Sequence, residues 1–169
     1  MVCRLVAIED EPEIADLLRV VLASPHVELR TAGTGAEGLA LIRDARPDLA
    51  ILDVMLPGGA DGWDVFDALR ADPAFAAMPV IMLTVQRHPG QRAPLFADDT
   101  LNQYLTKPFN PLTLRGHIER MLGRPGLWPA PSASFRSVLG VLSQAAEALD
   151  LERRYERPWI TGDNELDTT

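Results

Sequence analysis

The sequence predicts an α/β fold in which a doubly wound, five-stranded parallel sheet carries helices on both faces. Short apolar runs alternate with helical patterns five times along residues 1–123. Strands that alternate with helices pair in parallel, because the chain must cross over the sheet between them. The third and fourth apolar runs are continuous, which is typical of central strands that are buried on both faces.

The predicted strands are short and end at polar or turn residues. They cover residues 4–8, 27–31, 49–52, 79–83 and 102–105. The predicted helices cover residues 12–23, 35–45, 62–71, 90–100 and 111–122. Apolar residues recur at helical spacing on one face of each of the first three, at Ile14, Leu17, Leu18, Val21 and Leu22, at Leu39 and Ile42, and at Val65, Phe66 and Leu69. Pro12 suits a first helical turn. The helix over 90–100 is expected to be short or irregular, because Gly90 and Pro94 interrupt it.

Charge and length limit the partners that we expect. The chain has 169 residues and a formal net charge of −8. Binding to a phosphate backbone needs clustered positive charge, which neither half of the sequence carries. Residues 125–169 are also too few, and too poor in basic residues, for a winged-helix or helix-turn-helix output domain. We therefore expect no direct DNA binding and a protein as the downstream partner.

The N-terminal region and the single cysteine indicate the compartment. No apolar run reaches the ~18 residues that a membrane span needs. The first eight residues are followed at once by Glu9, Asp10 and Glu11, which does not fit a secretory signal. Cys3 is the only cysteine, so it cannot form an internal disulfide, and it is expected in the core. A cytoplasmic protein without membrane contact is expected.

The region after the sheet divides into three predicted parts. Residues 124–133 are rich in Pro and Gly and predict a linker, residues 134–155 predict a helix, and residues 156–169 predict an irregular acidic tail. The apolar stripe of the helix runs through Phe135, Val138, Leu142, Ala145 and Leu149. Three roles stay open for this helix: docking on its own domain, forming a homodimer, or connecting to an effector.

Polar residues follow four of the predicted strands. Glu9 and Asp10 follow the first, Asp53 the third, Thr84 the fourth, and Lys107, the only lysine of the chain, the fifth. In doubly wound sheets, ligands bind beyond the carboxyl ends of the strands. These side chains are therefore expected to meet at one edge of the sheet.

The chemistry of this set favours a magnesium ion and a phosphoryl group. Carboxylates gathered at one place repel one another unless a cation lies between them, and Mg²⁺ prefers oxygen ligands. No Cys–His set is present, which disfavours zinc. Asp53 could act as a nucleophile that forms an aspartyl phosphate, with Lys107 neutralising one phosphoryl oxygen and the Thr84 hydroxyl donating a hydrogen bond to another. Taken singly, each residue could instead be a helix cap or a turn residue.

The motifs together resemble the receiver domain of two-component response regulators, which belongs to the CheY-like superfamily. They are Ala7-Ile8-Glu9-Asp10-Glu11-Pro12-Glu13-Ile14, Leu52-Asp53-Val54-Met55-Leu56-Pro57-Gly58, Asp61-Gly62-Trp63, Val80-Ile81-Met82-Leu83-Thr84 and Tyr104-Leu105-Thr106-Lys107-Pro108-Phe109. The resemblance covers residues 1–123, the expected receiver domain, and implies a flavodoxin-like sheet with the strand order 2-1-3-4-5.

The resemblance also implies a role for each site residue. Glu9, Asp10, Asp53 and the Met55 carbonyl would hold Mg²⁺, and Asp53 would accept the phosphoryl group of a histidine kinase or a histidine phosphotransfer protein. Thr84 and Lys107 would contact that group, Thr84 and Tyr104 would form the switch, and the Lys107–Pro108 peptide bond would be cis. The protein would be a phosphoacceptor that catalyses only its own phosphorylation and dephosphorylation.

Three departures from the family pattern stand out. The loop from Pro57 to Gly62 is one residue longer than usual. Val85 follows Thr84 where a smaller residue is common. The region around residues 86–94 contains helix-breaking residues, so the output face is expected to be less regular than the family pattern.

Two other functions remain as alternatives. A haloacid-dehalogenase-like phosphatase shares the Asp, Thr, Lys and Mg²⁺, but it needs a second Asp at the position of Met55. A phosphorylation-independent interaction scaffold would not use the site at all.

Overall fold

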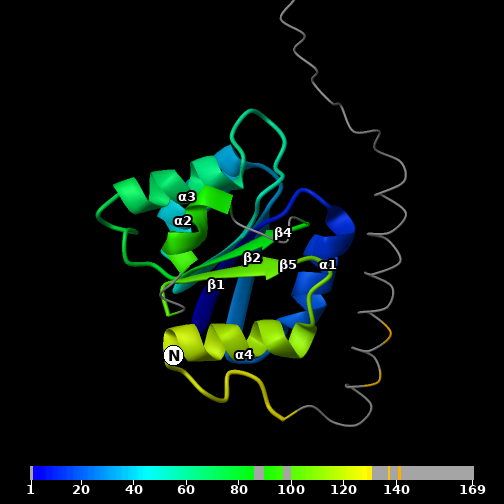
Figure 1. Cartoon of the computed structure of the whole chain (residues 1–169). Coiled ribbons are helices and arrows are strands. Elements are labelled where there is room, and N and C mark those ends of the chain that lie inside the picture. The colour runs from blue at the N-terminus through cyan, green and yellow to red at the C-terminus, as the bar shows by residue number, and fades with distance from the viewer. Residues whose placement is uncertain (1, 86–89, 97–99, 131–136, 138–140, 142–169) are drawn as a thin grey trace, which may run out of the picture.

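A computed structural model of the chain describes residues 2–85, 90–96, 100–130, 137 and 141. Five parallel strands form one sheet in the order β2-β1-β3-β4-β5, which confirms the predicted fold class (Figure 1). The elements are β1 (Cys3–Ile8), α1 (Pro12–Val21), β2 (Val27–Ala32), α2 (Gly35–Ala45), β3 (Leu49–Asp53), α3 (Gly62–Ala71), β4 (Val80–Thr84), the 3₁₀ helix η1 (Gly90–Phe96), β5 (Asn102–Thr106) and α4 (Pro111–Leu122).

The sheet is packed on both faces, as its sequence pattern predicts. Successive residues of β1 point to opposite faces: Leu5 and Ala7 pack with α1 and α4, whereas Val6 and Ile8 pack with α2 and α3. All residues of β3 and β4 are buried. The central strands are therefore held rigidly, and the residues at their carboxyl ends start from fixed positions.

The connection between β4 and β5 differs from the other connections between strands. Instead of an α-helix, residues Gly90–Phe96 form a 3₁₀ helix that contains Pro94 and has no buried residue. Pro94 has no N–H for an intrahelical hydrogen bond, which disfavours a regular α-helix. The prediction of a short or irregular helix in this region is confirmed for residues 90–96.

The loop between β3 and α3 turns sharply beside the edge where the polar residues gather. Gly58 and Gly59 have φ angles of 92° and 88°, in the region that favours glycine. The loop ends at Asp61, whose side chain accepts hydrogen bonds from the backbone N–H groups of Trp63 and Asp64. The side chain of Asp64 accepts one in return from the N–H of Asp61, which completes a capping box and fixes the start of α3.

The segment after α4, expected as a linker, packs on the domain. Leu127 and Trp128 are buried with the residues of α1 and α4. The Trp128 indole Nε1 donates to the carbonyl of Leu22 at 3.2 Å, and the Ser24 hydroxyl donates to the carbonyl of Leu127 at 2.5 Å. The described part of the segment is therefore anchored, because two apolar side chains and two hydrogen bonds tie it to the end of α1.

The remaining C-terminal predictions lie outside the described residues. Of the predicted helix over 134–155 only Ser137 and Val141 are described, and both are helical and exposed. The predicted tail over 156–169 is not described. Among the described residues, no helix has both the length and the apolar character to cross a membrane.

Candidate functional site

The carboxyl ends of the strands bring the predicted site residues to one edge of the sheet. Asp53 is the last residue of β3 and pairs in register with Leu83, so Thr84 lies one position beyond it on the neighbouring strand. Glu9 follows β1, and Lys107 follows β5. Glu9, Asp53, Thr84 and Lys107 are all buried although each is polar. Such groups are buried at a cost unless they interact with one another.

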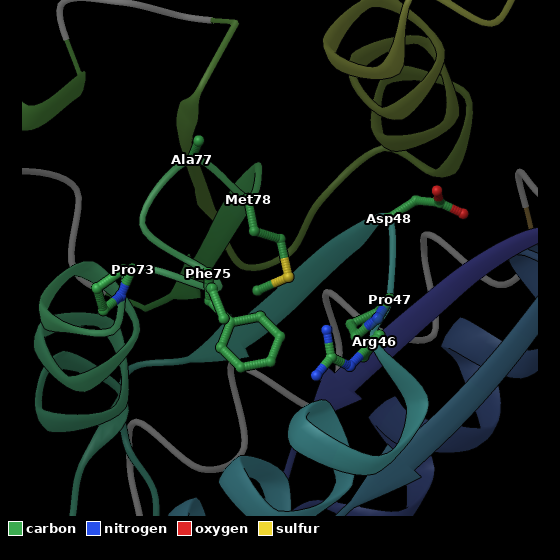
Figure 2. Close-up of a pocket in the computed structure, with 8 residues that line it drawn as sticks. Arg46, Pro47, Asp48, Pro73, Phe75, Ala77 and Met78 are labelled. Atoms are coloured by element: carbon green, nitrogen blue, oxygen red, sulfur yellow. The ribbon is translucent and has the colours of Figure 1, made fainter.

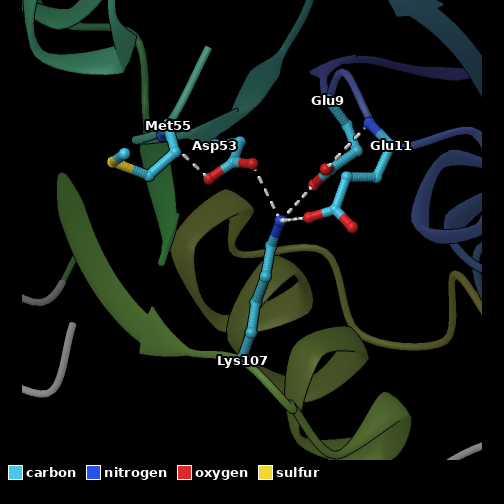
Figure 3. A network of polar contacts seen from close by, with 5 residues as sticks. All are labelled: Glu9, Glu11, Asp53, Met55 and Lys107. Carbon is cyan, nitrogen blue, oxygen red and sulfur yellow. Dashed lines mark hydrogen bonds and ion pairs between the residues drawn. The ribbon is translucent and has the colours of Figure 1, made fainter. Parts of the chain in front are cut away.

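The ammonium group of Lys107 lies at the centre of the site (Figure 3). Its Nζ donates to Glu9 Oε2 at 2.7 Å and to Asp53 Oδ2 at 2.9 Å, and it lies 3.8 Å from Glu11 Oε1. The backbone holds the lysine in place, because the Lys107 N–H donates to the carbonyl of Thr84 at 2.7 Å. The Lys107–Pro108 peptide bond is cis, as the family resemblance implies.

Four carboxylates form a cluster that suits a hard cation. Glu9, Asp10, Glu11 and Asp53 each offer an oxygen, and these oxygens lie within 4.8 Å of one another. All the ligand atoms that this cluster offers are carboxylate oxygens, some from buried and some from exposed residues. Mg²⁺ prefers such oxygens together with water. Glu11 is the member to which sequence reasoning gave no role. Its place in the acidic run after β1 was the available signal.

Met55 is adjacent to the nucleophile position rather than part of the carboxylate cluster. Its side chain is exposed. Its backbone N–H donates to Asp53 Oδ1 at 3.1 Å (Figure 3). This hydrogen bond leaves Oδ2 to Lys107, so the two oxygens of Asp53 have different partners. The role of the Met55 carbonyl as a metal ligand stays a prediction.

The electrostatics of the site reflect an excess of negative charge. Burial and the neighbouring Asp53 carboxylate raise the pKa of Glu9 from 4.5 to about 8, although Lys107 opposes the rise. Burial works to lower the pKa of Lys107, but the Glu9 and Asp53 carboxylates outweigh it and raise that pKa. One ammonium therefore does not neutralise the cluster, and a divalent cation would relieve the remaining repulsion.

Tyr104, the predicted switch residue, lies in an aromatic cluster beside Thr84. Its ring is stacked on Trp63, with centroids 6.2 Å apart and planes at 16°, and meets Phe96 edge-on at 5.4 Å. Burial raises the pKa of the Tyr104 phenol, and a hydrogen bond with the Thr84 side chain opposes this rise. The two residues predicted to form the switch therefore lie beside each other, and Trp63 packs against the Tyr104 ring.

A pocket at the opposite edge of the sheet is separate from this site. It has a volume of about 310 Å³ and is lined by the turn after α2 and the connection between α3 and β4 (Figure 2). Its lining residues are Arg46, Pro47, Asp48, Pro73, Ala74, Phe75, Ala77 and Met78. These segments precede β3 and β4, whereas Asp53 and Thr84 end those strands, so the pocket does not communicate with the carboxylate cluster.

The fold and the arrangement of the site are those of a two-component receiver domain, and comparison with known proteins agrees. The sequence matches the model of the response regulator receiver domain family over residues 5–119. The chain therefore belongs to this family, as the motifs predicted. Receiver domains are phosphoacceptors of two-component systems rather than enzymes in the ordinary sense.

Curated relatives are longer response regulators. The chain is 33% identical over 135 residues to the DNA-binding response regulator MtrA of Mycolicibacterium smegmatis, covering 80% of this chain and 57% of that protein. It is 33% identical over 157 residues to the DNA-binding dual master transcriptional regulator RpaA of Synechocystis, covering 93% of this chain and 62% of the relative. The chain thus spans about three fifths of the relatives that it matches.

Solved structures share the fold of the described domain. The chemotaxis protein CheY4 of Vibrio cholerae is 29% identical with a TM-score of 0.63, over 72% of this chain and 99% of that one. The receiver domain of the sensor histidine kinase PA1611 of Pseudomonas aeruginosa is 26% identical with a TM-score of 0.63, over 73% and 99% of the two chains. That structure has a magnesium ion coordinated in the active-site cleft.

The relatives contradict one prediction. MtrA and RpaA are both named as DNA-binding proteins, so the prediction of no direct DNA binding is wrong. The prediction relied on the net charge of −8 and on the small number of residues after the sheet. A receiver domain need not itself be basic in a protein that binds DNA, so its charge does not decide the question.

Proposed function

We propose that this chain is a phosphorylation switch in which Asp53 accepts a phosphoryl group from a histidine kinase or a histidine phosphotransfer protein. The observation that supports it best is the pair of hydrogen bonds from the buried Lys107 ammonium to Asp53 and Glu9. A lone buried ammonium beside a carboxylate cluster is the arrangement that a dianionic phosphoryl group and a divalent cation need. A cytoplasmic location is part of this proposal.

Each site residue has a defined task in the proposed transfer. Glu9, Asp10, Asp53 and the Met55 carbonyl would hold Mg²⁺, which when bound neutralises charge on the phosphoryl oxygens. An oxygen of Asp53 forms the new bond to phosphorus, the phosphorus–nitrogen bond of the donor phosphohistidine breaks, and its electron pair stays on the imidazole nitrogen. Lys107 moves from Asp53 Oδ2 to a phosphoryl oxygen, and the Thr84 hydroxyl donates to another.

The signal would pass from the phosphoryl group to a partner through the switch residues Thr84 and Tyr104. Donation by the Thr84 hydroxyl to the phosphoryl group would reorient this side chain beside Tyr104, so phosphorylation would disturb the contact between them and shift a two-state equilibrium. We propose that this shift alters a surface that a partner protein reads or through which the chain self-associates. Following the relatives, the process that it controls is DNA binding by this protein or by its partner.

The phosphatase alternative is not supported by the residue beside the nucleophile. Its general acid would stand at Met55, whose thioether cannot donate a proton to a leaving group, although the side chain is exposed at 52%. Steady release of phosphate from an aryl phosphate would revive that alternative. Partner binding that is the same with and without phosphorylation would favour a scaffold.

The test uses a stable mimic of the phosphoryl group. The full chain with Mg²⁺ and beryllofluoride should bind one equivalent by calorimetry, and acetyl phosphate should add one phosphoryl mass. Asp53→Asn should abolish both, while Asp44→Asn, at an exposed carboxylate paired with Arg30, should abolish neither. A wild-type chain that responds to neither reagent would refute the proposal.

A further inference from the structure

The 3₁₀ helix η1 is fastened to α3 by a two-pronged ion pair. Arg92 Nη1 donates to Asp67 Oδ1 at 2.7 Å, and Arg92 Nη2 donates to Asp67 Oδ2 at 2.8 Å. The guanidinium also lies over the ring of Trp63, with its Cζ 4.7 Å from the ring centroid. Parallel hydrogen bonds of this kind fix orientation as well as distance, so Arg92 holds η1 at one place on α3.

A second tie holds the other end of η1. The Asn102 side chain, which is buried, donates from Nδ2 to the carbonyl of Leu95 at 2.7 Å. Its Oδ1 accepts from Arg70 Nη2 at 2.6 Å, and Arg70 belongs to α3. Phe96 then lies among the rings of α3, 6.0 Å from Trp63 and 6.3 Å from Phe66 between centroids. The seven residues of η1 are therefore attached to α3 and β5 at both ends.

The fastened residues are those that hold Tyr104. Trp63 lies against one side of the Tyr104 ring and Phe96 meets it edge-on. Arg92 covers Trp63, and η1 carries Phe96. Any displacement of the Tyr104 ring from this position must therefore separate stacked rings that the Arg92–Asp67 pair keeps together.

We propose that Arg92, through Asp67 and Trp63, is a positioning residue that stabilises the observed position of the Tyr104 ring against Trp63 and Phe96, and that it thereby opposes phosphorylation of Asp53. This inference deepens the proposed function and rests on it. Turning the Thr84 hydroxyl toward a phosphoryl oxygen would change the space beside the Tyr104 ring, so the ring position that Trp63 and Phe96 hold competes with the phosphorylated arrangement. Interactions that stabilise only one of two states weaken the binding of a ligand that selects the other state.

The experiment compares beryllofluoride affinity in the full chain at saturating Mg²⁺ by calorimetry. Arg92→Gln should bind beryllofluoride about two- to fivefold more tightly than the wild type, the range that an exposed ion pair with a cation–π contact supplies. Asp67→Asn should act in the same direction, and the double variant should show less than the product of the two effects. Arg92→Lys, which keeps the charge but not the fork, should fall between Arg92→Gln and the wild type.

Controls separate a positioning role from a general loosening of the fold. Arg30→Gln removes a comparable exposed ion pair, at 2.9 Å from Asp44, and should leave beryllofluoride affinity unchanged. The Mg²⁺ affinity of Arg92→Gln should also stay at the wild-type value, because Arg92 does not touch the carboxylate cluster. Equal or weaker beryllofluoride binding by both Arg92→Gln and Asp67→Asn would overturn this inference alone. A wild type that does not bind beryllofluoride would overturn the proposed function together with it.

Discussion

Lys107 Nζ lies closer to Glu9 Oε2, at 2.7 Å, than to Asp53 Oδ2, at 2.9 Å. The ammonium is therefore shared between a predicted metal ligand and the predicted phosphoacceptor. Because a cation bound by Glu9 would compete with the ammonium for the same oxygen, metal binding and the freedom of Lys107 to reach a phosphoryl group are coupled.

This sharing predicts the effect of removing the lysine charge. Lys107→Met should bind Mg²⁺ more tightly, by about tenfold, because a positive charge that competes for Glu9 and repels the metal is lost. The same variant should bind beryllofluoride much more weakly, since the phosphoryl mimic loses its cation. Calorimetric titration of both ligands measures the two effects, with Arg19→Gln at an exposed pair as the control. Unchanged or weaker Mg²⁺ binding would show that the ammonium does not compete with the metal.

The raised pKa of Glu9 predicts a pH dependence of stability without metal. Its pKa rises from 4.5 to about 8 on folding, through burial and the nearby Asp53 carboxylate. The folded protein therefore holds the proton more tightly, and the resulting stability is complete below pH ~4.5 and is lost as the pH rises through about 8. Lys107, whose pKa is also raised, stays charged throughout this window.

Urea unfolding in a chelator at pH 5.5, 7 and 8.5 measures this dependence. The free energy of unfolding should fall by roughly 1–3 kcal/mol across the series. Glu9→Gln should flatten the slope, because the amide has no proton to lose. Saturating Mg²⁺ should also reduce the slope in the wild type, since the metal replaces the proton on the cluster. Stability of the wild type that rises over the same range would contradict the assignment.

The convergence of the site residues could be predicted from the sequence, because their positions at the ends of the strands follow from the fold. Once the runs are recognised as parallel strands, their carboxyl ends must lie at one edge, so Glu9, Asp53, Thr84 and Lys107 come together without knowledge of side-chain packing. The order of the strands needed the family resemblance, because alternating strands and helices are compatible with several orders.

The contacts that the sequence did not predict join residues far apart in the chain. Trp128 packs against Leu22, 106 positions earlier, in a segment whose Pro and Gly content indicated a linker. Arg92 reaches Asp67 across 25 positions from a region that the helical pattern described poorly. Both depend on how elements dock, and local periodicity does not encode docking. The sequence feature that indicated packing was the pair of large apolar side chains, Leu127 and Trp128. The Pro and Gly content of the segment had favoured a linker instead.

The close packing of Gly62 against β3 predicts a substitution that distorts the site. A Cβ at this position would lie 2.0 Å from the carbonyl oxygen of Asp53 and 2.8 Å from Val54 Cα, both backbone atoms at the end of the strand. Gly62→Ala should therefore destabilise the fold by about 1–3 kcal/mol and weaken beryllofluoride binding, because Asp53 must shift. Gly116→Ala is the matched control.

Gly116 lies in α4, where an added Cβ would meet no atom of another element within 4 Å. Alanine there should therefore stabilise the helix by about 0.5–1 kcal/mol without changing ligand affinity. Urea unfolding and calorimetry report both quantities. If Gly62→Ala behaved like Gly116→Ala, the contact between α3 and the end of β3 would not constrain Asp53.

The anchored position of Trp128 predicts that the folded receiver unit extends beyond the expected boundary at residue 123. The ring is buried, Nε1 donates to the carbonyl of Leu22 at 3.2 Å, and the Arg115 guanidinium lies 5.5 Å from the ring centroid. Trp128→Ala should lower the free energy of unfolding by about 3 kcal/mol or more, because it leaves a cavity between α1 and α4.

Trp128→Phe separates the two contributions, since it keeps most of the ring but loses the hydrogen bond, and should cost about 1 kcal/mol for the missing donor in addition to a small packing loss. Leu112→Ala, at a half-exposed position of α4, should cost much less than Trp128→Ala. Urea unfolding of the full-length variants measures all three. A Trp128→Ala variant as stable as Leu112→Ala would mean that the segment after α4 is a linker as its composition suggested, because the buried indole would then contribute nothing to the fold.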